Sequence, residues 1–524
     1  MNEPASSPAN MLQRFAPAWA DVALVLLVFA YFGAWPVPDT NEAHYLAKAK
    51  HYWQPQWIAD DLFLSSANSH IGFYATFGYA TQLFSLPTAA WVCRIACWLL
   101  LAIGWRRLSF SLLPRYCIAA ASAACVVVLN ENFHLAGEWF VGGAEAKVPA
   151  YALVFFGLAD IFQARWNRGL AVLGAAAAMH VLVGGWSLVA VGFVWLTDRA
   201  RPSLWTLLPG LILAGLFAFI GVVPGLRLNA GLDPELVATG NQIYVFQRIA
   251  HHLWAPEFVA KFGVRHAALY AVYAATCFAI APDDARRRLR RFVAAAAIFS
   301  SIGLLVSYAS PEPSRWAAAI LKYYWFRLSD VAVAMGMTFE LVAMASRHDS
   351  ATFVKKLAVA TMFLLIGWGA VSVWQARAVR DGVPRGERID DAATYANWRD
   401  ACEWIRDNTP RDAHVLAPRA FLTFKWFSER AEYGNWKDVP QDAMHLLIWK
   451  AALDELYGTE GEYGGWINYV PRDRVLAACR RNHVTHIVAF CEPPLDLPVL
   501  YRNNSFAVYR VEFPVSGPQQ DAAR

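Results

Sequence analysis

Two acidic side chains follow the first apolar stretch of the chain and are its first candidates for chemistry. Asp39 and Glu42 stand three residues apart in DTNEAHYLAKAKHYW, so a helix that begins at Thr40 places both carboxylates on one face. One carboxylate could take a proton from an acceptor hydroxyl, and the pair could hold a divalent cation that neutralises a leaving phosphate. The alternative is an N-cap aspartate beside a solvated glutamate.

A second polar loop, ENFHLAGEWFVGGAEAKVPAY, gathers carboxylates beside one lysine. Glu138 and Glu145 flank a Gly-Gly pair, and Lys147 stands where the next apolar stretch begins. Acidic groups beside a lysine fit binding of a metal ion and a phosphate. We therefore predict that both glutamates join the first acidic pair, Asp39 and Glu42, as ligands of Mg²⁺ or Mn²⁺, and that Lys147 binds a donor phosphate. An ordinary polar loop is the alternative.

The segment QRIAHHLWAPEF brings one arginine close to two histidines. Arg248 precedes His251 and His252, and adjacent residues of a helix point about 100° apart. Phosphate binding by Arg248 and one histidine is therefore favoured over a metal site made by both histidines. Aromatic and histidine packing at the membrane interface is the alternative.

Charges also interrupt the apolar segment that contains LKYYWFRLSD. Lys322, Arg327 and Asp330 lie in or near a predicted membrane span, where an unpaired charge costs several kcal/mol. Arg327 and Asp330, three residues apart, could simply pair with each other. Lys322 and Arg327 together are candidates to meet an anionic lipid headgroup at the outer end of the span.

The composition indicates what positions these residues. Of 524 residues, 57% are hydrophobic and 17% are charged, which is more apolar surface than one soluble core uses. The net charge of +5 lies in short clusters beside apolar stretches, so no continuous basic face points to nucleic acid. The eight cysteines show no metal or redox spacing.

Apolar stretches predict about eleven membrane-crossing helices. The predicted spans are 18–38, 88–104, 116–130, 148–164, 170–182, 185–196, 203–225, 266–281, 292–308, 317–345 and 357–376. With this number of crossings the arginine and lysine clusters all fall on one side, which places the N-terminus in the cytoplasm. The stretch 71–86 is expected to lie on the outer leaflet as an interfacial helix, with a true span as the alternative.

The chain after the last span has the composition of a water-soluble domain. WRDACEWIRDNTPRDAHVLAP predicts a helix, a turn and a strand, and HVTHIVAF and NSFAVYRVEF predict two later strands. We therefore expect a transmembrane domain over 1–380, with a large first outer loop at 39–87, and a small extracytoplasmic α/β domain over 381–524. Cys402, Cys479 and Cys491 could include one disulfide or remain buried thiols.

Several of these segments together resemble a known family. DTNEAHYLAKAKHYW, HLAGEWFVGGAEAKVPAYALVF, MHVLVGGWSLVA, RIAHHLW, YYWFRLSDVAVA and TFKWFSERAEYGNWKDVPQDA are similar to the DUF6798 family of bacterial, planctomycete-type multi-pass membrane proteins. The arrangement of spans, outer loops and C-terminal domain resembles the GT-C glycosyltransferase superfamily. That resemblance implies a catalytic carboxylate at Asp39 or Glu42 and an acidic position of the second loop at Glu138 or Glu145. The Asp-x-x-Glu spacing departs from the adjacent acidic pair of that superfamily.

The function expected from residues and resemblance together is a glycosyltransferase of the cytoplasmic membrane. It would move a sugar, a hexose or a pentose, from a polyprenyl-phosphate donor to a glycan, lipid or protein acceptor on the outer face, with the cations above holding the phosphate. The alternatives are a metal-independent ligase or lipid-modifying transferase that uses Arg248 with His251 or His252, and a transporter or flippase with charges along its path.

Overall fold

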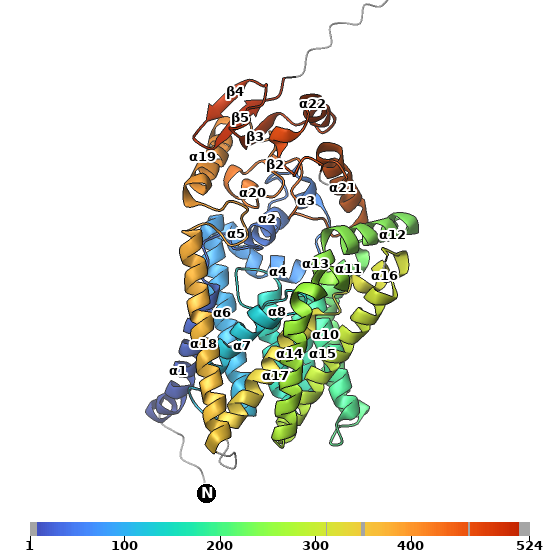
Figure 1. Cartoon of the computed structure of the whole chain (residues 1–524). Helices are drawn as coiled ribbons and strands as arrows, with labels where there is room; N and C mark the ends of the chain where they lie inside the picture. Colours follow the sequence, from blue (N-terminus) through green and yellow to red (C-terminus); the bar gives the residue numbers. More distant parts are fainter. Residues whose placement is uncertain (1–7, 311, 347–351, 460–461, 513–524) are drawn as a thin grey trace, which may run out of the picture. The chain divides into compact units, whose positions relative to one another are not determined.

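The computed structural model describes residues 8–310, 312–346, 352–459 and 462–512. The chain divides into two compact units (Figure 1). The first contains Met1–Ala49 and Asn68–Val379, and the second contains Lys50–Ala67 and Arg380–Arg524. Our prediction assigned the whole loop 39–87 to the membrane domain, whereas the structure groups residues 50–67 with the C-terminal part of the chain.

The first unit is a bundle of helices. Each predicted span overlaps one helix of the following set: α1 (Pro8–Gly33), α6 (Leu86–Leu112), α7 (Ile118–Phe133), α8 (Lys147–Phe162), α9 (Trp166–Met179), α10 (Val181–Thr197), α11 (Leu204–Arg227), α14 (Ala255–Ala279), α15 (Asp284–Ala309), α17 (Arg327–Ser346) and α18 (Thr352–Arg380). Within the described chain, α6, α11, α15, α17 and α18 are each long and apolar enough to cross a membrane. Shorter apolar helices accompany them at Ala18–Gly33, α7 and α10. These helices indicate an integral membrane protein.

Small residues allow some of these helices to pack closely. A Cβ atom added to Gly174 of α9 would lie 2.4 Å from Ala214 Cα of α11, and one added to Gly221 of α11 would lie 2.3 Å from the Ala177 carbonyl oxygen of α9. Only glycine permits this separation of the two backbones. Such close contacts are typical of helices that pack inside a membrane.

Two predictions about the apolar stretches are resolved by the helix boundaries. The stretch 71–86 forms α4 (Ile71–Ala75), a 3₁₀ turn η1 (Phe77–Tyr79) and α5 (Ala80–Leu83), each far too short to cross a bilayer. The prediction of one continuous span over 317–345 is wrong. The helix breaks between α16 (Arg315–Leu321) and α17, where Tyr324 has a φ of 57°. The break places Arg327 at the beginning of α17.

The remaining short helices of the first unit connect the long ones. They are α12 (Pro234–Gln242), the π-helix η2 (Ile243–Arg248) and α13 (Ala250–Leu253), while α2 (Glu42–Trp53) begins in this unit. Much of the first part of the loop 39–87 therefore lies in α2.

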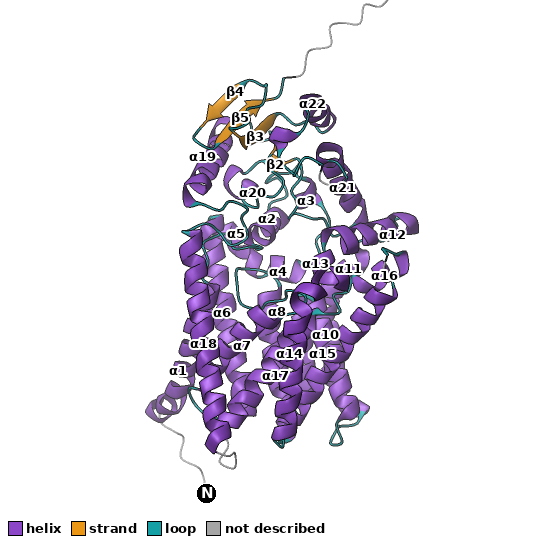
Figure 2. Ribbon diagram, viewed as in Figure 1, coloured by secondary structure: helices purple, strands orange, loops and turns teal. Residues whose placement is uncertain are grey.

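The second unit contains all the strands of the described chain (Figure 2). The strands β1 (His414–Leu416), β2 (Ala431–Glu432), β3 (His486–Phe490), β4 (Val499–Arg502) and β5 (Phe506–Arg510) form one sheet of order β2-β1-β3-β5-β4. The β2-β1 and β1-β3 pairs are parallel, and the β3-β5 and β5-β4 pairs are antiparallel. Helices α3 (Leu62–Ser65), α19 (Ala392–Asn408), α20 (Phe424–Ser428), α21 (Ala443–Tyr457) and α22 (Arg472–Arg481), with the 3₁₀ turn η3 (Ile467–Tyr469), complete the unit.

The core of the second unit is formed by alternating strand residues and one face of α19. Trp398 and Cys402 of α19 are fully buried against Val415, Val488 and Val508 of three strands. Helix, turn and strand therefore lie where the sequence around 398–418 predicted them. Of the two alternatives for the cysteines of this unit, the structure shows buried free thiols at Cys402, Cys479 and Cys491.

Candidate functional site

The acidic pair Asp39 and Glu42 lies where the chain passes from α1 into α2. The Asp39 backbone N–H donates to Glu42 Oε2 at 2.7 Å, so the two residues are close, as their spacing predicted. Both side chains are buried, with 2% of Asp39 and none of Glu42 exposed. The pair is therefore enclosed by other parts of the first unit.

Glu42 is held by an arginine to which we had assigned no role. Arg94 of α6, itself fully buried, donates from Nε to Glu42 Oε1 and from Nη2 to Glu42 Oε2, both at 2.5 Å. The Ala144 backbone N–H also donates to Oε1, at 2.7 Å. Four donors thus surround this carboxylate, and two of them come from one guanidinium in a two-point contact. Both oxygens of Glu42 are therefore occupied by hydrogen-bond donors.

The Asp39 carboxylate accepts hydrogen bonds from two backbone N–H groups, one of which belongs to the second polar loop. Its Oδ1 accepts from the Thr40 backbone N–H at 2.7 Å, and its Oδ2 accepts from the Gly143 N–H at 3.1 Å. A Cβ atom at Gly143 would lie 2.7 Å from Glu42 Cδ and 2.9 Å from Asp39 Cβ. The glycine is therefore needed for this close approach of the loop to the acidic pair.

The second outer loop brings its two glutamates to one lysine, as the sequence suggested. Lys147 Nζ lies 3.8 Å from Glu138 Oε2 and 3.8 Å from Glu145 Oε2, and it lies 3.4 Å from the centre of the Trp139 ring. Asn41 Nδ2 donates to Glu145 Oε2 at 2.8 Å. Burial raises the pKa of Glu145, although Lys147 and Asn41 act in the opposite direction.

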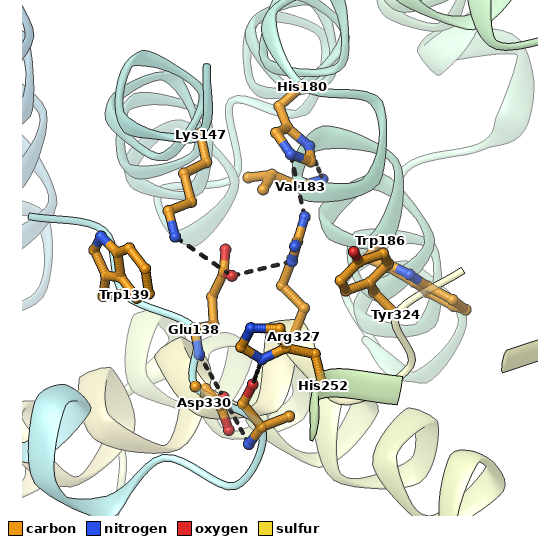
Figure 3. Close-up of polar contacts among 12 residues, drawn as sticks. Glu138, Trp139, Lys147, His180, Val183, Trp186, His252, Tyr324, Arg327 and Asp330 are labelled. Atoms are coloured by element: carbon orange, nitrogen blue, oxygen red, sulfur yellow. Dashed lines mark hydrogen bonds and ion pairs between the residues drawn. The ribbon is translucent and has the colours of Figure 1, made fainter. Parts of the chain in front are cut away.

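Arg327 joins this group from the beginning of α17. Its Nε lies 3.0 Å from Glu138 Oε2, and its Nη1 lies 3.1 Å from His180 Nε2. Its guanidinium also lies 4.1 Å from the centre of the Tyr324 ring. Figure 3 shows the Glu138 carboxylate between Lys147 and Arg327, with His180 on the far side of the arginine. We call Glu138, Glu145, Lys147 and Arg327 the head cluster.

The expected pairing of Arg327 with Asp330 is wrong. The Asp330 carboxylate instead accepts from the backbone N–H groups of Leu135, Ala136 and Glu138, at 2.7, 3.1 and 3.0 Å (Figure 3). A carboxylate that accepts three backbone hydrogen bonds fixes the course of the loop. Asp330 therefore orients the loop that carries Glu138 and leaves Arg327 to bind Glu138 itself.

The other expected phosphate ligands are arranged around the cluster in different ways. His252 Nδ1 contacts the Ala136 carbonyl oxygen, and its ring lies 4.1 Å from that of His251. Burial holds the pKa of His252 well below its usual range, so its ring is neutral. Arg248 is buried at the end of η2. Lys322 Nζ donates to Asn241 at 3.4 Å. Of the six residues predicted to bind the donor phosphate, Lys147 and Arg327 share a carboxylate in the described contacts.

Sequence reasoning missed three side chains that adjoin the cluster. Tyr45 Oη lies 3.3 Å from His70 Nε2, and the His70 ring lies 4.9 Å from that of His180. Burial lowers the pKa of His70 to about 3, so it remains neutral. These residues come from three separate segments of the chain, so no local motif could have revealed their proximity.

The four carboxylates predicted to hold a divalent cation do not meet as one ligand set. Over the residues that the structure describes, no group of three or more His, Cys, Asp or Glu side chains is arranged to hold a metal ion. Glu42, Glu138 and Glu145 instead have arginine or lysine partners.

A second buried charge cluster, not predicted, lies in the second unit. Lys425 Nζ of α20 lies 2.6 Å from Asp438, 3.0 Å from Glu432 and 3.4 Å from Asp61. Burial opposes the charged lysine, but the three carboxylates outweigh it and raise the pKa of Lys425 well above its usual range. The contact with Asp61 explains why residues 50–67 belong to this unit.

The sequence of the second unit contains a match to a known domain. Residues 396–456 match the domain of unknown function DUF6798. The match includes TFKWFSERAEYGNWKDVPQDA and so confirms the resemblance for this part of the chain. A search of curated protein sequences finds no match.

Solved structures resemble this chain over most of its length. The arabinofuranosyltransferase AftD from Mycobacteria has a TM-score of 0.52 at 13% identity, over 98% of this chain and 42% of AftD. The oligosaccharyltransferase AglB from Archaeoglobus fulgidus, in complex with an inhibitory peptide and a dolichol-phosphate, has a TM-score of 0.46 at 10% identity, over 91% of this chain and 70% of AglB. ArnT from Cupriavidus metallidurans, bound to undecaprenyl phosphate, has a TM-score of 0.47 at 13% identity, over 98% and 100% of the two chains. The chain has a GT-C-like fold and spans less than half the length of AftD.

Proposed function

We propose that the protein is a membrane glycosyltransferase that moves a sugar from a polyprenyl-phosphate donor to an acceptor at the outer face of the cytoplasmic membrane. The observation that carries the proposal is the head cluster, in which a buried Lys147 and a partly buried Arg327 lie on either side of the Glu138 carboxylate. An anionic phosphate can take the place of that carboxylate between the same two cations. The GT-C-like fold supports the assignment as an analogy only.

Three side chains take part in the proposed reaction, those of Asp39, Lys147 and Arg327. The bond between the sugar C1 and the phosphate oxygen breaks, and a bond forms between C1 and the acceptor oxygen. Asp39 takes the hydroxyl proton of the acceptor as general base. Lys147 and Arg327 offset the charge that develops on the leaving polyprenyl phosphate, which is the kind of interaction that grows stronger in the transition state.

We propose Asp39 as the base because both oxygens of Glu42 are bound by Arg94. Asp39 accepts from the backbone N–H groups of Thr40 and Gly143. Glu42 then positions Asp39 by accepting its backbone N–H. Because the loop around Gly143 covers Asp39, an acceptor reaches this carboxylate only after the loop moves away.

We propose further that the reaction needs no divalent cation. Three of the four carboxylates predicted as its ligands, Glu42, Glu138 and Glu145, have cationic partners, and Lys147 and Arg327 already supply two positive charges at the same place. Sugar transfer that continues in excess EDTA is the expected result. Activity that EDTA removes and Mg²⁺ or Mn²⁺ restores would return the acidic residues to a role as metal ligands.

The proposed orientation follows from the charges at one end of the bundle. Arg165 and Arg199 lie in the connections that precede α9 and α11, Arg106 lies in the last turns of α6, and Arg287 lies in the first turn of α15. All four are at the end of the bundle where α7, α9 and α11 begin. Placing this end in the cytoplasm satisfies the positive-inside rule. With eleven crossings, this orientation places the N-terminus in the cytoplasm and the second unit outside it. The head cluster then lies at the outer end of the bundle.

The test is release of polyprenyl phosphate by the purified full chain in lipid, from a panel of radiolabelled polyprenyl-phosphate hexoses and pentoses. Asp39→Asn should abolish release, and Arg327→Gln should lower it by about 10²–10³-fold, the size typical for loss of one transition-state donor. The matched control is Lys261→Gln, an exposed cation of α14 outside the cluster. No release from any donor, or equal release by all variants that remain folded, would contradict the proposal.

A further inference from the structure

An apolar crevice opens between α7, α17 and α18, remote from the head cluster. Its volume is about 160 Å³, and its lining includes Ile118, Ala121, Val342, Ala345, Met362 and Phe363. The lining comes from the first turns of α7, the last turns of α17 and the early turns of α18. The crevice therefore lies at the end of the bundle opposite to Arg327, from which the 20 residues of α17 separate it by about 30 Å.

The crevice exists because the close contact between α18 and the bundle lies further along α18, at Gly369 and Ala370. There, a Cβ atom at Gly369 would lie 2.2 Å from Val128 Cγ2, and Tyr31 Oη donates to the Ala370 carbonyl oxygen at 2.7 Å. Toward the start of α18, small side chains such as Ala121 and Ala345 face it from the bundle. They leave a gap that no side chain of the lining fills.

The surroundings of the crevice identify it as a surface that faces lipid. α18 has the length and composition of a membrane span, and 74% of the Phe363 side chain and 73% of Leu364 are exposed. An apolar gap on such a surface is filled in the membrane by hydrocarbon, because water finds no polar partners there. The occupant is thus an acyl chain.

Positive charge marks the end of the crevice at the predicted cytoplasmic surface. Lys355 precedes the lining residues Val359, Met362 and Ile366 by 4, 7 and 11 residues, so all four share one face of α18. One helical turn, about 5.4 Å, separates Lys355 from Val359. Lys356 follows Lys355, and the exposed Arg115 lies three residues before Ile118.

We infer that the crevice binds one acyl chain of an anionic phospholipid whose headgroup phosphate contacts Lys355, Lys356 and Arg115. Cations at the inner membrane surface attract anionic headgroups. The crevice adds a defined place for the hydrocarbon chain. This site is separate from the proposed donor site, and its occupation does not depend on whether the protein transfers sugar.

The test is native mass spectrometry of the purified full chain after exchange into phosphatidylglycerol or phosphatidylcholine. The wild type should retain phosphatidylglycerol at least several-fold better than phosphatidylcholine. Ala121→Phe and, independently, Ala345→Leu fill the crevice and should remove that retention. The double variant Lys355→Gln with Lys356→Gln should abolish the preference for the anionic headgroup.

Matched controls separate the crevice from the general surface. Leu364→Phe adds bulk at a neighbouring position that faces outward, and Arg199→Gln removes an exposed charge at the same end of the bundle. Both should retain phosphatidylglycerol like the wild type. Equal retention of the two lipids, or retention that both crevice-filling variants leave unchanged, would overturn the inference. Displacement of phosphatidylglycerol by equimolar polyprenyl phosphate would also overturn it, in favour of the donor lipid.

Discussion

Each unit of the molecule buries one lysine among carboxylates, and the two clusters differ in their balance of charge. In the first unit, Lys147 and Arg327 contact Glu138, and Lys147 also contacts Glu145. In the second unit, Lys425 contacts three carboxylates, those of Asp61, Glu432 and Asp438. The first cluster has equal numbers of charges of each sign, whereas the second has three acids for one base.

This difference indicates different roles for the two lysines. Two cations on one glutamate can exchange that glutamate for another anion without leaving a positive charge unpaired. A lone lysine among three acids is itself the group that keeps the acids buried, and burial raises the pKa of Glu432 to about 7. The head cluster therefore suits binding of a ligand, while the Lys425 cluster suits structural attachment of residues 50–67.

The largest effect should follow from removing the cation of the Lys425 cluster. Lys425→Met takes away the positive charge that three buried carboxylates contact, and breaking a buried ion pair in this way costs about 3–5 kcal/mol. Unfolding of this unit can be followed in the full chain as maleimide labelling of Cys402 and Cys479, both fully buried. Labelling should become much faster in the variant.

The control for this change is Lys450→Met, which removes a lysine that pairs with Asp454, one helical turn away in α21. A pair at this spacing contributes about 0.2–0.5 kcal/mol, so labelling should stay near the wild-type rate. If Lys425→Met labels no faster than the control, the Lys425 cluster does not stabilise the second unit.

A smaller effect should appear in the pH dependence of the second unit. Because burial raises the pKa of Glu432 from 4.5 to about 7, the folded unit binds more protons than the unfolded chain between these values. Its free energy of unfolding should therefore fall as the pH rises from 4.5 to 7, by at most about 1.4 kcal/mol per pH unit. Cysteine labelling, normalised to the unfolded chain at each pH, measures this slope.

Glu432→Gln supplies the comparison for the pH dependence. The amide does not titrate, so the slope over this window should flatten in the variant. If the slope stays unchanged, another group of the second unit titrates in this window, and the Lys425 cluster does not bind the proton.

The smallest effect should come from the head cluster, where the substitution should strengthen donor binding. Glu138→Gln removes the negative charge that competes with a donor phosphate for Lys147 and Arg327. The KM for the polyprenyl-phosphate donor should fall by a few-fold, equivalent to less than about 1.4 kcal/mol. Steady-state transfer at several donor concentrations measures it, with Glu257→Gln of α14, an exposed acid, as control. A higher KM in folded protein would mean that Glu138 itself contributes to donor binding.

Local sequence patterns predicted the helices well, because long apolar stretches leave few alternatives in a membrane protein. Each predicted span overlaps a helix, and the helix and strands expected around 398–418 and 483–513 are present. The break before α17 was missed, because Tyr324 and its neighbours are apolar enough to hide a turn.

Contacts between distant segments could not be predicted in this way. Arg94 lies 52 residues from Glu42, and Asp330 lies 192 residues from the Glu138 N–H that it binds. The expected pairing of Arg327 with Asp330 rested on spacing alone, and the fold offered each residue a better partner. Spacing did succeed for Asp39 with Glu42 and for Lys147 with its two glutamates, because those contacts form within a single loop or turn.

The origin of the second unit from two separated segments has a consequence for biosynthesis. Asp61 leaves the ribosome 364 residues before Lys425, its partner in the finished protein. At about 5–20 residues per second, the early segment waits roughly 20–70 s while the intervening helices are made. During that interval, residues 50–67 have no other part of the second unit to pack against. The second unit is thus completed last, and ribosome-bound chains that end before residue 425 should leave residues 50–67 open to protease.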